Sequence, residues 1–224
     1  MEYVTLKNIN KTYGSYQAST DVSFSIEKGK LVALLGPSGS GKTTILRMIA
    51  GLEKQDSGDI IIDGKVVNDL PGSKRGIGFV FQNFALIDHC SVFENVVLPL
   101  EAAGVSRRER TKRVNEILEL VGIEDLKNKY PGQISGGQKQ RVAISRALIH
   151  NPKIILADEP TGALDAATGE AILGILKKVN QMGNTVILVT HDEKIAKKTN
   201  RLLILENSRL VSDTPINICQ EVMI

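Results

Sequence analysis

The sequence predicts an α/β fold with a mostly parallel sheet, an antiparallel β part at its N-terminal end and an inserted helical lobe. Three observations support this prediction. Five short runs are apolar at every position, as expected of strands that helices cover on both faces. Amphipathic helical patterns separate these runs. The first thirty residues read as strands and turns, with side chains alternating between two faces over 23–26.

The five apolar runs lie at 31–35, 77–81, 154–157, 186–189 and 202–205. The helices between them are recognised by their ends. Ser106 and Glu109 have the spacing of a capping box, and Gly122 ends the apolar stripe that follows. Ser135 opens a second helix, and Asp165 caps a third that ends near residue 183.

The composition is that of an ordinary globular chain. Its 224 residues suffice for one domain with a small inserted lobe. The 28 basic and 25 acidic residues leave a net charge of +3, which gives no reason to expect nucleic acid or an anionic membrane as a partner. Cys90 and Cys219 form no disulfide framework and favour a reducing compartment. We expect neither a signal peptide nor a membrane-spanning run.

The strongest chemical signal is the segment from Gly36 to Thr43, which fits the phosphate-binding pattern G-x-x-x-x-G-K-[ST]. A strand enters it and a helical segment, 44–50, leaves it, as a P-loop NTPase core requires. Its glycines let backbone N–H groups surround phosphate oxygens. Lys42 is placed to reach the β- and γ-phosphates, and the Thr43 hydroxyl to ligate Mg²⁺. The alternative is a glycine-rich turn, but a chance match is on the order of one in a hundred.

Two carboxylates follow the apolar run at 154–157. Asp158, at the end of a strand, is placed to hold Mg²⁺, and Glu159 to polarise the attacking water as general base. A strand followed by an acidic turn is common, so this signal depends on the phosphate loop upstream.

A second candidate phosphate site begins at Ser135. Ser135 and Gln138 form a capping box, which leaves Gly136 and Gly137 unexplained, because glycine destabilises a first helical turn relative to alanine. Their presence makes sense if a phosphate approaches the backbone at this helix N-terminus.

Together these motifs resemble the ATP-binding subunit of an ATP-binding-cassette (ABC) transporter, over about residues 4–210. The phosphate loop matches the Walker A motif, 154–159 the Walker B motif and 135–138 the cassette signature, with Ile134 where leucine is usual. The resemblance implies an ATPase that uses ATP and Mg²⁺. It implies one domain, 1–224, with a nucleotide-binding core (1–82 and 134–224) and a helical subdomain (83–133). The implied nucleotide-binding residues are Tyr13, Gly36, Pro37, Ser38, Gly39, Ser40, Gly41, Lys42, Thr43, Thr44, Ser135, Gly136, Gly137, Gln138 and Asp165.

The resemblance assigns roles to further residues. Tyr13 stands where the family stacks an aromatic ring on adenine, with Tyr3 and Tyr16 as alternatives. Gln82 resembles the Q-loop glutamine, which ligates Mg²⁺ and senses the small lobe. His191 resembles the switch histidine, which contacts the γ-phosphate.

Two cassettes of this family pair head to tail, so that the signature of one closes on the nucleotide held by the other. Asp165 resembles the D-loop aspartate that couples the two sites. The resemblance therefore implies a homodimer, or a paired cassette, that closes on ATP and opens on hydrolysis involving Glu159. It also implies a separate integral membrane permease subunit, a peripheral location on the cytoplasmic side of the cell membrane, and no nucleic acid partner.

Four apolar residues follow Gln82 in the part of the lobe that receives the permease's coupling helix in this family. They line an apolar groove for that helix or fill the lobe's own core, and the sequence favours neither interpretation: Phe84, Leu86, Ile87 and Phe93.

The subfamily signals are mixed. Segments 95–100 and 155–165 resemble the macrolide-exporter and lipoprotein-release class, whereas the short stretch at 70–76 resembles bacterial importers. Such importers commonly add a C-terminal regulatory domain, and this chain stops at Ile224, so we favour the exporter-like class. The cargo and the membrane partner are not indicated.

Two other functions compete with a transport role. One is a soluble cassette protein that acts on nucleic acid or ribosomes; the interval from Gln82 to Ser135 has no room for a long coiled coil, and the chain carries one cassette. The other is a nucleotide kinase, against which the signature and His191 argue.

Overall fold

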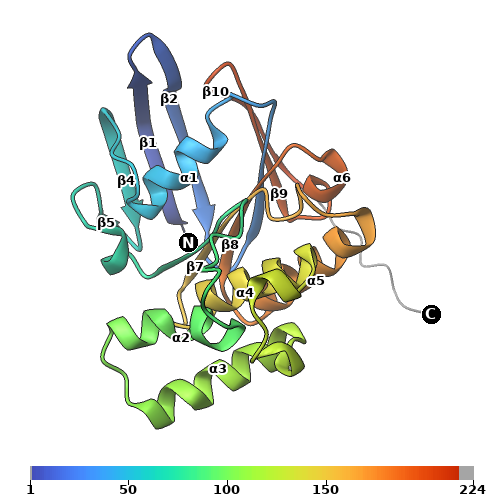
Figure 1. Ribbon diagram of the computed structural model, residues 1–224. Helices are drawn as coiled ribbons and strands as arrows, with labels where there is room; N and C mark the ends of the chain where they lie inside the picture. Colours follow the sequence, from blue (N-terminus) through green and yellow to red (C-terminus); the bar gives the residue numbers. More distant parts are fainter. Residues whose placement is uncertain (1, 217–224) are drawn as a thin grey trace.

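The structure is a computed structural model that describes residues 2–216, so Cys219 lies outside the described residues. It contains two sheets (Figure 1). The smaller sheet is antiparallel and has the order β2-β1-β4-β5. Its strands are β1 (Glu2–Tyr13), β2 (Tyr16–Glu27), β4 (Ser57–Ile62) and β5 (Lys65–Val66). The predicted N-terminal antiparallel part is therefore confirmed, and the β4–β5 hairpin extends it.

The larger sheet has the order β10-β9-β3-β8-β7-β6, and all neighbours except β10 and β9 are parallel. This confirms the mostly parallel sheet. Each predicted apolar run is one of its strands, and the carboxyl ends of the parallel strands meet at one edge. The strands are β3 (Leu31–Leu35), β6 (Ile77–Val80), β7 (Ile154–Asp158), β8 (Thr185–Thr190), β9 (Arg201–Glu206) and β10 (Arg209–Pro215).

Helices cover both faces of the larger sheet. The six α-helices in the described part of the chain are α1 (Lys42–Ala50), α2 (Val92–Ala102), α3 (Arg107–Val121), α4 (Gly136–Leu148), α5 (Ala166–Gln181) and the short α6 (Glu193–Ala196). Helix α1 lies on one face of the sheet, and α4 and α5 lie on the other. Three 3₁₀ turns lie at Gly72–Lys74, Glu124–Leu126 and Pro131–Gln133. Helix α3 ends at Gly122, whose φ of 68° needs a residue without a side chain.

The capping box predicted at Ser106 is only half present. Ser106 Oγ accepts a hydrogen bond from Glu109 N at 3.4 Å. The Glu109 carboxylate instead accepts one from Arg113 Nε at 2.7 Å, because residues four apart face each other on a helix.

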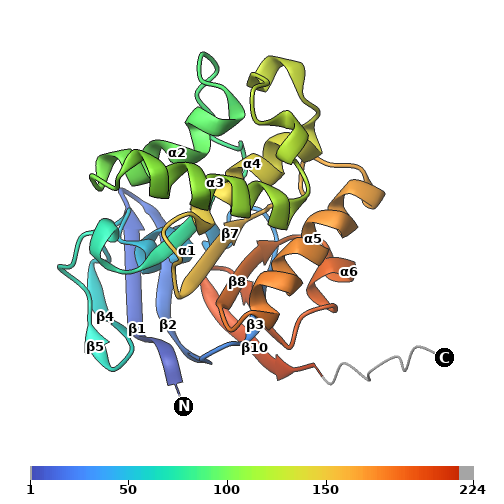
Figure 2. The ribbon, with the colours of Figure 1, turned by 90° about the horizontal axis from the view of Figure 1, so that it is seen from below.

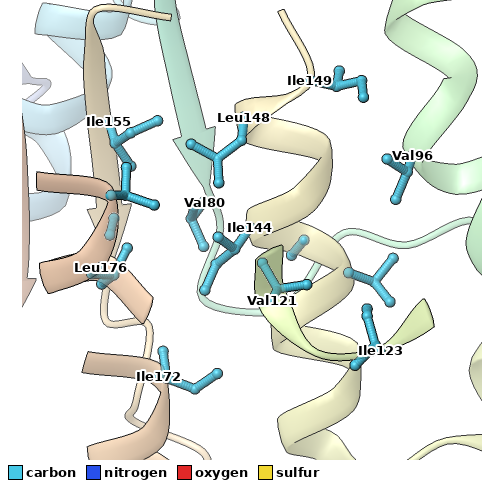
Figure 3. Close-up of a cluster of buried hydrophobic side chains, with 14 of the residues drawn as sticks. Val80, Val96, Val121, Ile123, Ile144, Leu148, Ile149, Ile155, Ile172 and Leu176 are labelled. Atoms are coloured by element: carbon cyan, nitrogen blue, oxygen red, sulfur yellow. The ribbon is translucent and has the colours of Figure 1, made fainter. Parts of the chain in front are cut away.

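The core consists of two buried clusters, one on each face of the larger sheet. Helix α1 lies between the two sheets, and α2 and α3 pack on α4, which lies against β6 (Figure 2). Figure 3 shows Ile144 and Leu148 of α4 beside Val80 of β6. Each fully buried side chain of this size contributes roughly 1.5–3 kcal/mol. Because Val96 of α2 belongs to the same cluster as the sheet residue Ile155, the core continues into the segment 83–133. The predicted division into a core and a subdomain stays a prediction.

Within residues 2–216, no helix combines the length and the apolar character that crossing a membrane requires.

Candidate functional site

The phosphate loop joins β3 to α1. Close packing requires two of its three glycines, Gly36 and Gly41, whatever ligand the loop holds. A Cβ at Gly41 would lie 1.9 Å from the Ala18 carbonyl oxygen of β2, and one at Gly36 would lie 2.1 Å from that of Leu205 in β9. Gly41 also has a φ of 92°, in the region that favours glycine. The loop is thus fixed between the two sheets, with the N-terminus of α1 behind it.

Lys42 opens α1 and is 5% exposed. Its Nζ donates hydrogen bonds to the carbonyl oxygens of Gly36 and Pro37, at 2.8 and 2.7 Å. Burial lowers the pKa of this ammonium, while the nearby carboxylates of Glu159 and Asp158 raise it. The loop therefore holds a buried ammonium group at its centre. This group would attract a ligand that carries several negative charges.

Asp158 ends β7 and is 5% exposed. Thr43 Oγ1 donates a hydrogen bond of 2.8 Å to its Oδ1. Burial raises the pKa of the Asp158 carboxyl, the hydrogen bond from Thr43 opposes this rise, and the neighbouring Glu159 charge adds to it. The Asp158 carboxylate is thus held at the phosphate loop, in a buried position that disfavours its negative charge.

Three predicted residues meet at the carboxyl ends of adjacent strands. Glu159 follows β7, Gln82 follows β6 and His191 follows β8. Gln82 Nε2 donates to Glu159 Oε2 at 3.2 Å, and His191 Nδ1 lies 3.2 Å from the same oxygen. Glu159 has a φ of 44°, which is uncommon for a residue with a side chain and is typical of strained functional positions.

A hollow of about 280 Å³ opens beside these groups. Its lining residues come from the phosphate loop, the first turn of α1 and the strand ends: Tyr16, Ser38, Gly39, Gly41, Lys42, Thr43, Thr44, Gln82 and Glu159. The hollow is polar and open, which suits a charged ligand rather than an apolar one.

Tyr16, and not the predicted Tyr13, is the tyrosine that lines the hollow. From the sequence, Tyr16 is an alternative to Tyr13. The Tyr16 hydroxyl donates a hydrogen bond to the Gly39 carbonyl. Tyr13 is 44% exposed at the end of β1. Burial and then Glu53 raise the pKa of its hydroxyl, whereas Thr44 lowers it. Tyr3 is buried in the core, which leaves Tyr13 and Tyr16 as the two rings near the loop.

The signature residues lie at the start of α4. The predicted capping box is present: Gln138 N donates to Ser135 Oγ at 3.3 Å, and Ser135 N donates to Gln138 Oε1 at 2.8 Å. A Cβ at Gly137 would lie 2.3 Å from Thr168 Cγ2, so packing against α5 also requires this glycine. Packing on Thr168 is thus a second reason for glycine at position 137, beside the predicted approach of a phosphate, which stays a prediction. Gly136 has room for a Cβ at 3.4 Å from Leu164.

Asp165 caps α5, as predicted. Thr168 N donates to Asp165 Oδ1 at 3.0 Å, and Thr168 Oγ1 donates to Asp165 Oδ2 at 2.6 Å. Because Thr168 also packs on Gly137, the D-loop and the signature are neighbours. None of the residues that line the hollow within the described chain comes from either segment.

The donor set fits Mg²⁺. The ion prefers oxygen ligands and is often held by one or two protein groups together with substrate phosphates. Thr43 and Asp158 supply two adjacent oxygens, and a cation there would relieve the disfavoured charge of Asp158. No cluster of three or more His, Cys, Asp or Glu side chains suited to a metal occurs in residues 2–216.

The fold and site define an α/β protein with a P-loop nucleotide-binding site. Residues 19–162 match the family model described as "ABC transporter". This chain therefore belongs to the ABC transporter family, and it is an ATP-binding cassette domain of that family.

Two curated relatives and one solved structure illustrate the match. The chain is 42% identical to the spermidine/putrescine import ATP-binding protein PotA of Thermotoga maritima, over 96% of this chain and 61% of PotA. It is 44% identical to the methionine import ATP-binding protein MetN of Clostridioides difficile, over 94% of this chain and 68% of MetN. The chain thus spans about two thirds of these relatives.

The solved structure is the dimeric ATP-binding cassette MJ0796 in a post-hydrolysis state bound to ADP and phosphate. It has a TM-score of 0.87 and 44% identity, over 96% of this chain and 99% of that one. The predicted preference for an exporter-like class finds no support here, because both named relatives are import subunits.

Proposed function

We propose that this chain binds and hydrolyses ATP with Mg²⁺ and thereby powers a membrane transport complex. One observation carries the proposal. The hollow gathers the phosphate loop, Gln82 and Glu159, while the signature lies outside it and packs on Thr168, the residue to which Asp165 is hydrogen-bonded. One chain thus offers two incomplete halves of a nucleotide site, and a second cassette placed head to tail completes both.

Each residue of the hollow has a role in this proposal. Lys42 neutralises the β- and γ-phosphates of ATP. Thr43, Asp158 and Gln82 hold Mg²⁺, which supplies positive charge against the phosphates when it is bound. Glu159 accepts the proton of the attacking water.

The neighbours of Glu159 orient it for this task. Gln82 and His191 hold its Oε2 oxygen from two sides, at 3.2 Å each. The other carboxylate oxygen is left to face a water. His191 is 59% exposed, so it can turn toward a γ-phosphate in the hollow.

The partner cassette supplies the second half of the site. Ser135, Gly136, Gly137 and Gln138 contact the γ-phosphate held by the other subunit, and Asp165 couples the two sites. The helix N-terminus that begins at Gly136 favours an anion. The MJ0796 structure, which is dimeric and bound to ADP and phosphate, supports this arrangement.

The membrane partner is an integral permease that docks on the segment after Gln82, on the cytoplasmic side of the cell membrane. Phe84, Leu86 and Phe93 are half-buried and pack against the core, and Ile87 is half-buried as well. Each side chain therefore keeps an exposed part that a coupling helix can contact. Packing against the core is one of the two predicted roles, and contact with a coupling helix is the part that we propose.

The relatives favour import over export. PotA and MetN are import subunits at 42% and 44% identity, which outweighs the short segments that resemble the exporter-like class. We therefore propose that the transport complex is an importer.

Two measurements test this function. The purified chain should hydrolyse ATP in the presence of Mg²⁺ and lose this activity with EDTA. A tagged chain cross-linked in membranes of the source cell should co-purify with an integral membrane protein. A partner with a large extracytoplasmic domain would overturn import in favour of mechanotransmission, and ribosomes or DNA-bound proteins alone would overturn the membrane role.

A further inference from the structure

The loop that follows Gln82 contains two strained residues in succession. Phe84 and Ala85 have φ values of 61° and 49°, in the left-handed region. Residues with a Cβ rarely adopt this conformation, and those that tolerate it best are Gly, Asn and Asp. Such strain persists only where the surroundings hold it, and it concentrates at functional segments.

Arg146 of α4 holds both residues. Its Nη1 donates to the Ala85 carbonyl oxygen at 2.6 Å, and its Nη2 donates to that of Phe84 at 2.9 Å. A guanidinium presents its N–H groups in a rigid fork, so one side chain fixes two carbonyl groups at a set spacing. The strained pair is thus attached to the helix that begins with the signature.

Gly78 explains how α4 comes so close to this loop. A Cβ at Gly78 of β6 would lie 2.3 Å from the Ala147 carbonyl oxygen of α4. The helix therefore approaches the strand at backbone distance, and Ile144 packs on Val80 of that strand (Figure 3). This places Arg146 beside the loop that leaves β6.

Asn95 of α2 holds the other end of the loop. Its Oδ1 accepts a hydrogen bond from Ile87 N at 2.8 Å, and its Nδ2 donates to the carbonyl oxygens of Ile87 and Cys90 at 3.0 and 2.9 Å. Asn95 is fully buried. The loop is thus fixed on α2 at its far end and, through Arg146, on α4 at its near end.

We propose that Arg146 is a positioning residue for ATP hydrolysis, which holds the Phe84–Ala85 pair so that Gln82 stays against Glu159. Gln82 lies 3.2 Å from the Glu159 carboxylate and two residues before Phe84. A shift of α4 when the signature meets a partner's nucleotide reaches Gln82 through the same side chain. This inference rests on the proposed ATPase function.

The first experiment measures kcat and KM for ATP in Arg146→Met and Arg146→Lys. Misplacing a catalytic group by about 1 Å can lower a rate on the order of 100-fold, so we expect kcat to fall at least about 10-fold in Arg146→Met. The KM for ATP should stay within about twofold, because the phosphate loop is untouched. Arg146→Lys keeps the charge but lacks the fork, and should recover only part of kcat.

Arg141→Met is the matched control. Arg141 lies on the same helix and also donates to a backbone carbonyl, that of Val121 at 2.8 Å, but at the end of α3. It should lower thermal stability and leave kcat per folded molecule unchanged. An equal loss of kcat in Arg141→Met would overturn the inference, because it would show a general effect of loosening α4.

A second variant keeps the inference testable if Arg146→Met is poorly folded. Glycine adopts a positive φ freely, so Ala85→Gly in the Arg146→Met background should raise kcat by about threefold or more. No recovery would overturn the inference, as would a wild-type kcat in Arg146→Met. A wild-type chain without any Mg²⁺-dependent ATPase activity would instead overturn the proposed function.

Discussion

Thr43 Oγ1 donates a hydrogen bond of 2.8 Å to Asp158 Oδ1, across 115 positions of the sequence. It joins the first turn of α1 to the end of β7. Both groups are proposed Mg²⁺ ligands. Asp158 is nonetheless buried, and this burial raises the pKa of its carboxyl. The fold thus retains an acid whose ionised form it disfavours.

Asp158→Asn should therefore stabilise the ligand-free protein and abolish its function. A raised pKa means that the folded state binds the proton more tightly than the unfolded state, so Asp158 makes stability fall as pH rises from the ordinary aspartate pKa through the raised one. Asparagine is neutral throughout, and its Oδ1 still accepts from Thr43. We expect a higher Tm at pH 7 and at least about 100-fold lower Mg²⁺-dependent turnover.

Thermal unfolding of both proteins between pH 3 and pH 8, without Mg²⁺, checks this prediction. The two melting curves should converge at the acid end, where Asp158 is protonated in both states. A variant that is less stable than the wild type at pH 7 would contradict the assigned cause.

Glu159→Gln should bind ATP without turning it over. The change removes the proposed base and keeps the size and the hydrogen bonding of the side chain, so turnover should fall about 10²- to 10⁴-fold. The variant should then accumulate an ATP-dependent dimer, which size-exclusion chromatography detects. Glu193→Gln, at an exposed residue paired with Lys197, is the control for loss of one charge. Unchanged turnover in Glu159→Gln would refute the role of Glu159.

Gly137 allows packing and phosphate binding to be separated. Gly137→Ala should clash with the Thr168 methyl group, because its Cβ would lie 2.3 Å from Thr168 Cγ2, and overpacking of this kind destabilises by roughly 1–3 kcal/mol. Thr168→Ser removes that methyl group and keeps the hydroxyl that bonds to Asp165. The double variant should regain the stability.

Measuring the ATPase activity and the thermal unfolding of the Gly137→Ala/Thr168→Ser variant distinguishes packing from phosphate binding at Gly137. If a partner's phosphate must approach the Gly137 backbone, the double variant stays impaired in turnover although it is stable. Full recovery of both properties would assign Gly137 to packing alone.

Much of the site follows from the rule that carboxyl ends of parallel strands share an edge. Gln82, Glu159 and His191 each come within two residues of the end of an apolar run, so their meeting is predictable once the runs are read as neighbouring parallel strands. The phosphate loop is equally predictable from the sequence, because its pattern is local and phosphate binding dictates its residue types.

The other features of the site depend on contacts between segments that are distant in the sequence, and no local pattern encodes such contacts. The packing of Gly137 on Thr168 depends on how α4 crosses α5, and both glycines of the signature therefore looked like ligand-binding residues. The left-handed backbone of Phe84 and Ala85 has no signal in the residue types, which favour other conformations. For the same reason Arg146 could not be distinguished from any other helix arginine.

The two tyrosines call for a test that separates the base of ATP from its phosphates. Tyr13 is proposed to stack on adenine, whereas Tyr16 lines the hollow and its hydroxyl bonds to Gly39. Base–aromatic stacking contributes roughly 1–3 kcal/mol, so Tyr13→Ala should weaken ATP binding on the order of 10-fold, and Tyr13→Phe should not. Inorganic tripolyphosphate lacks the base, and its affinity should be the same in Tyr13→Ala and the wild type.

Tyr16→Phe provides the comparison, because it keeps the ring and removes the hydrogen bond to the phosphate loop. It should weaken ATP and tripolyphosphate equally, since the loop contacts only phosphates. Calorimetric titration with ATP and with tripolyphosphate measures these differences in affinity directly. The proteins compared are the wild type, Tyr13→Ala, Tyr13→Phe and Tyr16→Phe. Equal losses for ATP and tripolyphosphate in Tyr13→Ala would instead assign Tyr13 to support of the phosphate-binding residues, such as Thr44, which lowers the pKa of the Tyr13 hydroxyl. Tyr16 would then be the ring that meets the base.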